Sequence, residues 1–305
     1  IQLFLGKKYM KALVISGGGS KGAFAGGVAQ HLIEEEKKNY DLFIGTSTGS
    51  LMITHLALGK VEELREIYSN VDQTTIFSSF PFRIKRFRGH QIVGINHRTT
   101  LRNFLRGSKT FGESLNLREM IEHRITDQDL QQALELEKKL LVTVSNLTLN
   151  QVEFKSLEEE SFSDFRDYIW ASSNFIPFMS LLTKNSFEYA DGGFANLVPV
   201  QEAIRRGATE IDAIVLETEV PQLNRLPSRN PFDLITHLFN FMQIHIEKSN
   251  ISIGKLEAEN RGVKLNLFYT PTVLTTNSLI FEKERMRKWW SQGFEYARKK
   301  HQGGS

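Results

Sequence analysis

The sequence predicts an α/β fold in which helices cover a parallel sheet. Two short apolar runs, residues 11–16 and 40–45, have the pattern of strands that are buried on both faces. Each run leads into a segment whose apolar residues recur at helical spacing, residues 20–38 and 50–60. A strand, a turn and a helix that repeat in this way are typical of a parallel, helix-covered sheet.

The rest of the chain continues this alternation. Further strands are expected on both sides of a turn near Asn150 and in three later apolar segments, at 138–156, 187–194, 209–219 and 263–271. Further helices are expected at 61–70, 98–107, 117–125, 165–177, 230–260 and 278–300. In the longest of these, Asn230 is placed to cap the helix and Pro231 to occupy its first position.

Length and composition indicate a globular protein with one domain. The chain has 305 residues, of which 40% are apolar and 24% charged. It contains no internal repeat and no linker rich in Pro, Gly or Ser, so a single domain is expected over residues 10–302. Residues 1–9 and 303–305 are expected to be leader residues or residues added for expression, because Met10 directly precedes the first strand and the chain ends in Gly-Gly-Ser.

The composition excludes several classes of function. The sequence has no cysteine, which rules out disulfides, thiolate nucleophiles and cysteine zinc sites and suits a reducing compartment. A formal net charge of +3 is too small to indicate a nucleic-acid partner. No apolar run approaches the roughly 20 residues of a membrane-spanning helix, and the first residues lack the layout of a signal peptide. A cytoplasmic location is therefore expected.

The stretch GGGSKG after the first strand allows three interpretations. Gly17, Gly19 and Gly22 match the dinucleotide pattern G-x-G-x-x-G. That pattern requires an acidic residue at the end of the next strand, whereas Asp41 begins that strand. A phosphate-binding P-loop requires Gly-Lys followed by Ser or Thr, whereas Lys21 is followed by glycine. The third interpretation is a row of backbone N–H groups that bind an oxyanion.

A second motif, GTSTG, lies where the second strand turns into a helix. It places Ser47 between Gly45 and Gly49 in the pattern G-x-S-x-G. A nucleophilic serine at such a turn needs small neighbours, because its backbone is strained and its hydroxyl must be exposed. The helix that begins there points its N–H groups at the negative charge that develops during the reaction. Ser47 is therefore a candidate nucleophile, and the first glycine loop is a candidate source of oxyanion donors.

A candidate base for this serine stands at the end of a later strand. Asp191 is followed by Gly192 and Gly193, which let the backbone pass close by. An Asp-Gly pair taken alone is most often a plain turn. It gains meaning here because it follows a strand and accompanies the two earlier motifs.

The motifs G-G-G-x-K-G, G-x-S-x-G and D-G-G, in this order and at strand ends, resemble those of the patatin-like phospholipases. The resemblance covers roughly residues 11–217. Other positions that fit the family are Ala171, Ser172 and Pro177 in the segment ASSNFIPF, and Asn196 and Pro199 after D-G-G. Residues 61–130 and those beyond 220 take no part in the resemblance, and 61–130 is a candidate lid or substrate region.

The resemblance implies a three-layer α/β/α sandwich around a mostly parallel sheet, and a serine hydrolase with a Ser–Asp dyad. Ser47 would be the nucleophile and Asp191 the general base. The motifs assign the oxyanion hole to Gly17, Gly18, Gly19 and Ser20, and supporting positions to Lys21, Gly22, Gly45, Gly49, Gly192 and Gly193. The expected activity is that of a lipid acyl hydrolase of the phospholipase A or lysophospholipase type.

Two alternatives remain open at this point. One is an ordinary α/β-hydrolase with the chain order Ser, Asp, His, for which His237 and His245 are the candidate histidines. The other is a non-catalytic member of the fold that binds lipid. No histidines have the spacing of a metal site, so neither a metal nor a cofactor is expected.

The expected ligand is a phospholipid or another acyl-ester lipid. Residues 80–90 interleave aromatic and basic side chains, which suits peripheral contact with an anionic membrane. The same alternation also fits an edge strand whose apolar side packs on the core. The sequence gives no oligomeric state, and it defines neither head group, acyl-chain length nor regiochemistry.

Overall fold

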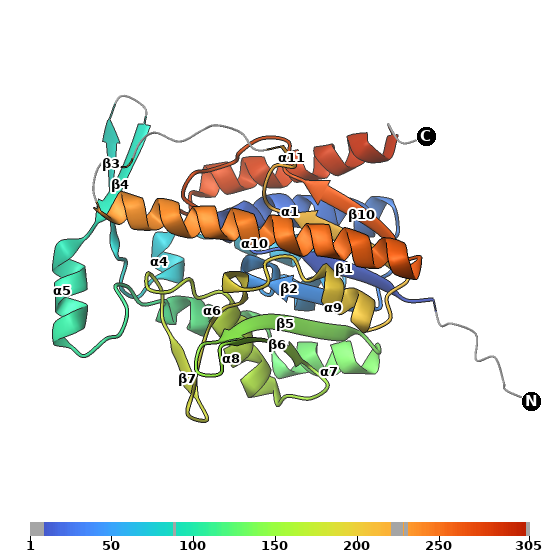
Figure 1. Cartoon of the computed structure of the whole chain (residues 1–305), viewed down its shortest axis with the longest axis horizontal. Helices are drawn as coiled ribbons and strands as arrows, with labels where there is room; N and C mark the ends of the chain where they lie inside the picture. Colours follow the sequence, from blue (N-terminus) through green and yellow to red (C-terminus); the bar gives the residue numbers. More distant parts are fainter. Residues whose placement is uncertain (1–8, 88–89, 221–227, 229–230, 303–305) are drawn as a thin grey trace, which may run out of the picture.

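The computed structural model describes residues 9–87, 90–220, 228 and 231–302, without the side chains of 85–92 and 232–233. In this part of the chain eight strands form one sheet in the order β10–β9–β1–β2–β5–β8–β7, with β6 paired to β5 (Figure 1). The strands of this sheet are β1 Lys11–Ile15, β2 Leu42–Thr46, β5 Lys139–Asn146, β6 Gln151–Ser156, β7 Leu182–Lys184, β8 Phe187–Asp191, β9 Glu210–Val215 and β10 Lys264–Tyr269. The five strands from β10 to β5 are parallel, whereas β6, β7 and β8 pair antiparallel with their neighbours. The predicted mostly parallel sheet is therefore confirmed.

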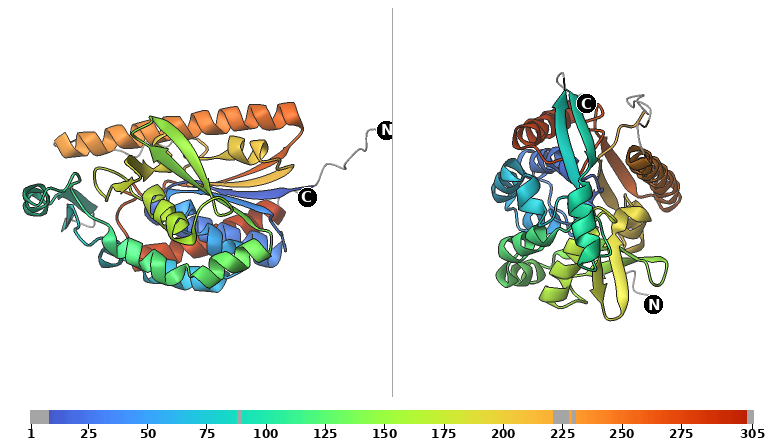
Figure 2. Two further views of the ribbon diagram at one scale, coloured as in Figure 1. Left: turned by 90° about the horizontal axis from the view of Figure 1, so that it is seen from below. Right: turned by 90° about the vertical axis from the view of Figure 1, so that its left-hand side faces the viewer.

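Helices cover both faces of the sheet. Their bounds are α1 Gly22–Gln30, α2 Ile53–Ala57, α3 Val61–Asn70, α4 Gln73–Ile76, α5 His97–Leu105, α6 Leu115–Arg124, α7 Asp127–Glu135, α8 Phe162–Ser172, α9 Val200–Arg205, α10 Pro231–Arg261 and α11 Lys283–Gln302. A separate hairpin, β3 Phe82–Phe87 and β4 His90–Ile95, projects from the body beside α5 (Figure 1). Figure 2 (left) shows α10 on one side of the sheet and α1 and α11 on the other.

The three layers follow from strands that are apolar on both faces. In β1, Leu13 and Ile15 point into the core beneath α1 and α11. Ala12 and Val14 alternate with them and point into a second core beneath α9 and α10. All four side chains are fully buried, as a strand inside a three-layer sandwich requires.

One helix ends earlier than the sequence predicts. The expected helix over 165–177 corresponds to α8, which ends at Ser172. The next two N–H groups, those of Ser173 and Asn174, donate to carbonyls three residues back, so the helix tightens and stops. Because the chain leaves the helix here, its Ser-Ser-Asn sequence lies beside the end of β2. The helix α7 and the short elements α9 and β7 have no counterpart among the sequence predictions.

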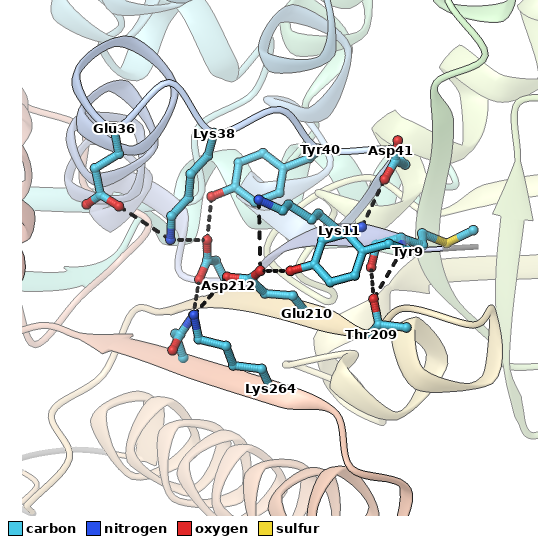
Figure 3. Close-up of polar contacts among 12 residues, drawn as sticks. Tyr9, Lys11, Glu36, Lys38, Tyr40, Asp41, Thr209, Glu210, Asp212 and Lys264 are labelled. Atoms are coloured by element: carbon cyan, nitrogen blue, oxygen red, sulfur yellow. Dashed lines mark hydrogen bonds and ion pairs between the residues drawn. The ribbon is translucent and has the colours of Figure 1, made fainter. Parts of the chain in front are cut away.

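A buried polar network joins β9 to its neighbours (Figure 3). Asp212 is 1% exposed, and its carboxylate accepts hydrogen bonds from Tyr40 at 2.6 Å, Lys38 at 2.7 Å and Asn266 at 2.7 Å. Burial alone would lower the pKa of Lys38, but the hydrogen bond to Asp212 raises it above its ordinary value. Asp41, the acid weighed for a ribose site, instead accepts from the backbone N–H of Lys11 at 2.9 Å.

We expect Asp212→Ala to lower the free energy of unfolding by about 3 kcal/mol, because it leaves the buried Tyr40 hydroxyl without an acceptor and the half-buried Lys38 with Glu36 alone. Asp212→Asn should lose less, since its amide oxygen still accepts from Tyr40. Urea unfolding of the two variants beside the wild type measures both values. An Asp212→Ala protein as stable as the wild type would show that the network contributes nothing.

Candidate active site

Ser47 stands at a strained turn between β2 and the helix that follows. Its φ of 55° lies in the left-handed region, which is uncommon for a residue with a side chain. A Cβ on Gly45 would overlap the backbone of Gly49, and a Cβ on Gly49 would overlap the carbonyl oxygen of Ile15. Both glycines are therefore required by the close approach of three backbone segments, and the turn holds the Ser47 hydroxyl out at the strand end.

Strand pairing along β5 brings Asp191 to this serine. On one edge of β5, β2 pairs until Thr46 lies opposite Thr143. The next residue of β5, Val144, pairs instead with Asp191 at the end of β8. Since β6 occupies the other edge of β5, β8 takes the edge that β2 leaves. The two strands thus run head to head, and Ser47 and Asp191 are the residues at which they meet.

The two side chains are hydrogen-bonded to each other. Ser47 Oγ donates to Asp191 Oδ2 at 2.7 Å, and the Gly193 N–H donates to Asp191 Oδ1 at 2.7 Å. Asp191 is 2% exposed. Burial raises its pKa to about 7, although the hydrogen bonds from Ser47 and Gly193 act in the opposite direction. The carboxylate therefore ionises near neutral pH, far above the usual range for aspartate.

Serines at the end of α8 and just after Ser47 bind the backbone of Ser47. Ser172 Oγ accepts from the Ser47 N–H at 2.9 Å, while Ser173 Oγ and Ser50 Oγ donate to the Ser47 carbonyl at 3.2 Å and 2.6 Å. Ser145 donates to the Asp191 carbonyl at 2.9 Å. The sequence analysis noted Ser172 by resemblance only, and it missed the other three. The run of serines and asparagine before Pro177 was the available signal.

The glycine loop lies against the same serine. A Cβ on Gly17 would come within 3.0 Å of Ser47 Cβ. The N–H groups of Gly17 and Ser20 donate to the carbonyls of Leu197 at 3.3 Å and Ser278 at 2.8 Å. Between them, the N–H groups of Gly18 and Gly19 have no acceptor within the described residues. The loop therefore presents two unused donors, held in place by a bond on either side.

Charged groups lie next to this loop. Lys21 is 7% exposed and forms an ion pair with Glu217, which excludes a freely solvated lysine at this position. Glu247 on α10 is 3% exposed, and its Oε2 has no hydrogen-bond partner in the described part of the chain. Burial, together with the Glu217 carboxylate, raises the pKa of Glu247 to about 8. Neither glutamate belongs to a recognisable motif, so the sequence gave no sign of them.

One cavity is lined by the glycine loop, Ser47 and Asp191, and by an apolar and a polar group of residues that are here called its two arms. The apolar arm is lined mostly by residues of α3, α4 and α6. Its lining includes Leu64, Ile67, Val71, Ile76, Leu117, Met120 and Ile121. The other arm is polar and lies under α10 and the segments around 217 and 275. Its lining includes Glu217, Asn240, Gln243, Glu247, Thr275 and Thr276.

The candidate histidines of a triad lie elsewhere. His237 Nδ1 is within hydrogen-bond distance of Ser228 Oγ at 2.8 Å, and the His245 ring packs on Phe241 with 4.3 Å between centroids. Within the described residues no histidine hydrogen-bonds to Ser47 or Asp191.

The described part of the chain contains no group of three His, Asp or Glu side chains that could hold a metal ion, and no helix with the length and apolarity needed to cross a membrane. Residues 80–90, the predicted membrane contact, include all of β3 and the first residue of β4. Residues 88–89 and the side chains of 85–90 lie outside what the structure describes.

Fold and site together define an α/β protein with a serine at a strand–helix elbow, hydrogen-bonded to a buried aspartate. The family model of the patatin-like phospholipases matches residues 13–204, and the chain belongs to this family. The family supports lipid acyl hydrolysis as the general activity.

Two individual proteins are similar to this chain. It is 27% identical over 290 residues to an uncharacterized protein, L620, of Acanthamoeba polyphaga mimivirus, a match over 79% of this chain and 76% of that protein. The crystal structure of VipD from Legionella pneumophila superposes with a TM-score of 0.51 at 16% identity. That match covers 95% of this chain and 66% of VipD, so the chain spans about two thirds of VipD. At this identity the likeness concerns the fold.

We expect Asp191→Asn to stabilise the protein at alkaline pH. The pKa of Asp191 in the folded protein, about 7, lies above the ordinary aspartate value of 3.8, so between these values the folded state binds more protons than the unfolded state. The free energy of unfolding therefore falls as pH rises from about 4 to about 7, by up to about 4 kcal/mol at 1.36 kcal/mol per pKa unit. Asparagine carries no such penalty.

Thermal unfolding at about pH 5 and about pH 8 tests this expectation. The advantage of Asp191→Asn over the wild type should grow with pH, while the exposed Asp127→Asn serves as a control without this trend. An advantage that stays constant with pH would contradict the raised pKa.

Proposed function

We propose that the protein is a serine lipid acyl hydrolase of the phospholipase A or lysophospholipase type, acting through a Ser47–Asp191 dyad. The observation that carries the proposal is the 2.7 Å hydrogen bond from Ser47 Oγ to a buried carboxylate at a strained elbow. A pKa near 7 lets Asp191 serve as a base at neutral pH, which an ordinary aspartate does poorly. The intact dyad argues against a purely lipid-binding role.

The chemical steps follow from this arrangement. Ser47 Oγ attacks the ester carbonyl carbon, and its proton passes to Asp191 Oδ2. The tetrahedral intermediate collapses, the bond to the leaving alcohol breaks, and that alcohol takes the proton. Water then attacks the acyl-enzyme and gives a proton to Asp191, which returns it to Ser47 as the fatty acid leaves.

The proposed oxyanion hole uses Gly18 and Gly19, because their N–H groups are unused. Gly17 and Ser20, which the motif also includes, would hold the loop through their bonds to Leu197 and Ser278. Losing one such donor typically raises the barrier by about 3–4 kcal/mol. The Lys21–Glu217 pair would fix the start of the helix after the loop, and Gly22 would leave room for Thr48.

The two arms of the cavity suit the two parts of a lipid. The apolar arm, lined largely by residues of 61–130, would take the acyl chain, and the polar arm would take the alcohol or head group. Residues 61–130 thus serve as the proposed substrate region. We further propose a cytoplasmic protein that contacts membranes peripherally, on the grounds of its cysteine-free composition and its lipid substrate.

The decisive experiment measures hydrolysis of a short-chain p-nitrophenyl ester by the wild type, Ser47→Ala and Asp191→Asn. We expect both variants to lose at least about 100-fold in kcat/KM, because each removes a partner of the proton transfer. A fluorophosphonate should label the wild type at Ser47 but not the alanine variant.

The remaining alternatives give distinct outcomes. Activity that survives Asp191→Asn but falls in His237→Ala or His245→Ala would favour a triad. A folded wild type with neither turnover nor label would favour a lipid-binding role.

We also expect kcat/KM to rise with pH through a midpoint near 7. Below this pH Asp191 is protonated and cannot accept the serine proton. Because Glu247 also titrates in the cavity, the profile of Glu247→Gln identifies the ionising group. A midpoint that stays near 7 in this variant supports Asp191, and one that disappears would assign the ionisation to Glu247.

A further inference from the structure

The N-terminal half of α10 turns several polar side chains into the cavity, beside the apolar Phe239 and Ile244, and turns a stripe of apolar side chains to solvent. Asn240, Gln243 and Glu247 line the cavity. On the opposite side of the helix, apolar side chains recur at spacings of three and four residues and are 36–59% exposed. These residues are Leu234, Ile235, Leu238, Phe241 and Met242. A surface helix normally has the reverse arrangement, with its apolar stripe on the core.

A second exposed apolar face lies on α5. Leu101 is 60%, Phe104 51% and Leu105 81% exposed. Beside them on the same exposed side of the helix stand three exposed arginines, Arg98, Arg102 and Arg106. None of these arginines forms an ion pair within the part of the chain that the structure describes. Apolar and basic groups that share one face suit the boundary between lipid head groups and acyl chains.

The sequence around α5 has an unusual charge. Residues 73–112 include 8 Lys and Arg and no Asp or Glu, although the whole chain carries only +3. Lys109, at the edge of this stretch, does pair with Glu188. Because this segment contains no acidic residue, nothing within it neutralises its other basic residues, and their charge favours an anionic surface.

The two apolar faces lie at the same end of the molecule. Figure 1 places α5, the β3–β4 hairpin and the N-terminal end of α10 together, and α10 contacts β4. The carboxyl ends of the strands, where Ser47 and Asp191 meet, face this end too, and α10 borders the cavity directly.

We propose that the exposed apolar side chains of α5 and of the N-terminal half of α10, with Arg98, Arg102 and Arg106, form a docking surface for an anionic lipid bilayer. The surface would hold the cavity at the membrane, with α10 between the lipid and the polar arm. A second copy of this chain is a weaker candidate, because two surfaces with the same unpaired arginines repel each other. The purpose of docking rests on the proposed lipid substrate, whereas vesicle binding is measured independently of it.

Co-flotation with phosphatidylcholine vesicles, with and without phosphatidylglycerol, tests this surface. We expect the wild type to float only with the anionic vesicles. The triple variant R98Q/R102Q/R106Q should partition about 100-fold more weakly, from a loss of about fivefold for each basic residue. The control R205Q/R261Q/R298Q removes the same charge from α9, the far end of α10 and α11, and should bind like the wild type.

The apolar contribution is tested with L105S and F241S, singly and together, against L136S. Leu136 is also exposed, at 51%, but stands beside β5 at the opposite, amino ends of the strands. We expect the double variant to lose anionic-vesicle binding and L136S to keep it, with unchanged hydrolysis of a soluble short-chain ester in all four variants.

Three outcomes would overturn the proposal: equal binding by the two arginine triple variants, equal binding of the wild type to neutral vesicles, or a dimer that L105S/F241S dissociates in a protein that binds no vesicles. Failure of ester hydrolysis in a wild type that still floats would reject the proposed function and leave the docking surface standing.

Discussion

The candidate site depends on one edge of β5 being shared by two strands. β2 pairs with that edge up to Thr46 and β8 pairs with it from Asp191, so the two strands meet at Ser47, the proposed nucleophile. A slip of either strand by one residue would turn its side chains to the opposite face and separate Ser47 from Asp191. The glycines at 45, 49 and 192 serve this junction, because each lies against a backbone segment that leaves no room for a Cβ.

Burial of the carboxylate explains both its chemistry and its cost. Removing water from Asp191 raises its pKa to about 7, which suits the proposed role as a base, and the same desolvation makes its charged form unfavourable in the folded protein. The surrounding structure offsets this penalty with fully buried strands and with buried polar groups that are fully hydrogen-bonded, such as Asp212. A stable scaffold around a destabilised site is the usual arrangement in enzymes.

Local features of the sequence were sufficient for much of the fold. The buried strands around β1 and β2, the helix α3 and the glycine and serine motifs are visible because a few neighbouring residues determine them. The antiparallel placement of β8 was not visible in the sequence, because it depends on pairing between residues far apart in the chain, such as Val144 with Asp191. For the same reason the sequence did not reveal that Ser278 closes the glycine loop.

The long helix α10 shows why periodicity alone could not assign a role to that segment. Its apolar residues recur at helical spacing, which correctly predicts a helix, but spacing does not tell which side faces the protein. Only the structure shows that Gln243 and Glu247 face the cavity while Leu238 and Phe241 face outward. An inward polar side is understandable if the cavity must accommodate the polar part of a lipid. An outward apolar stripe is what the proposed placement of this helix between the cavity and a membrane requires, because an ordinary surface helix has water on its outer side.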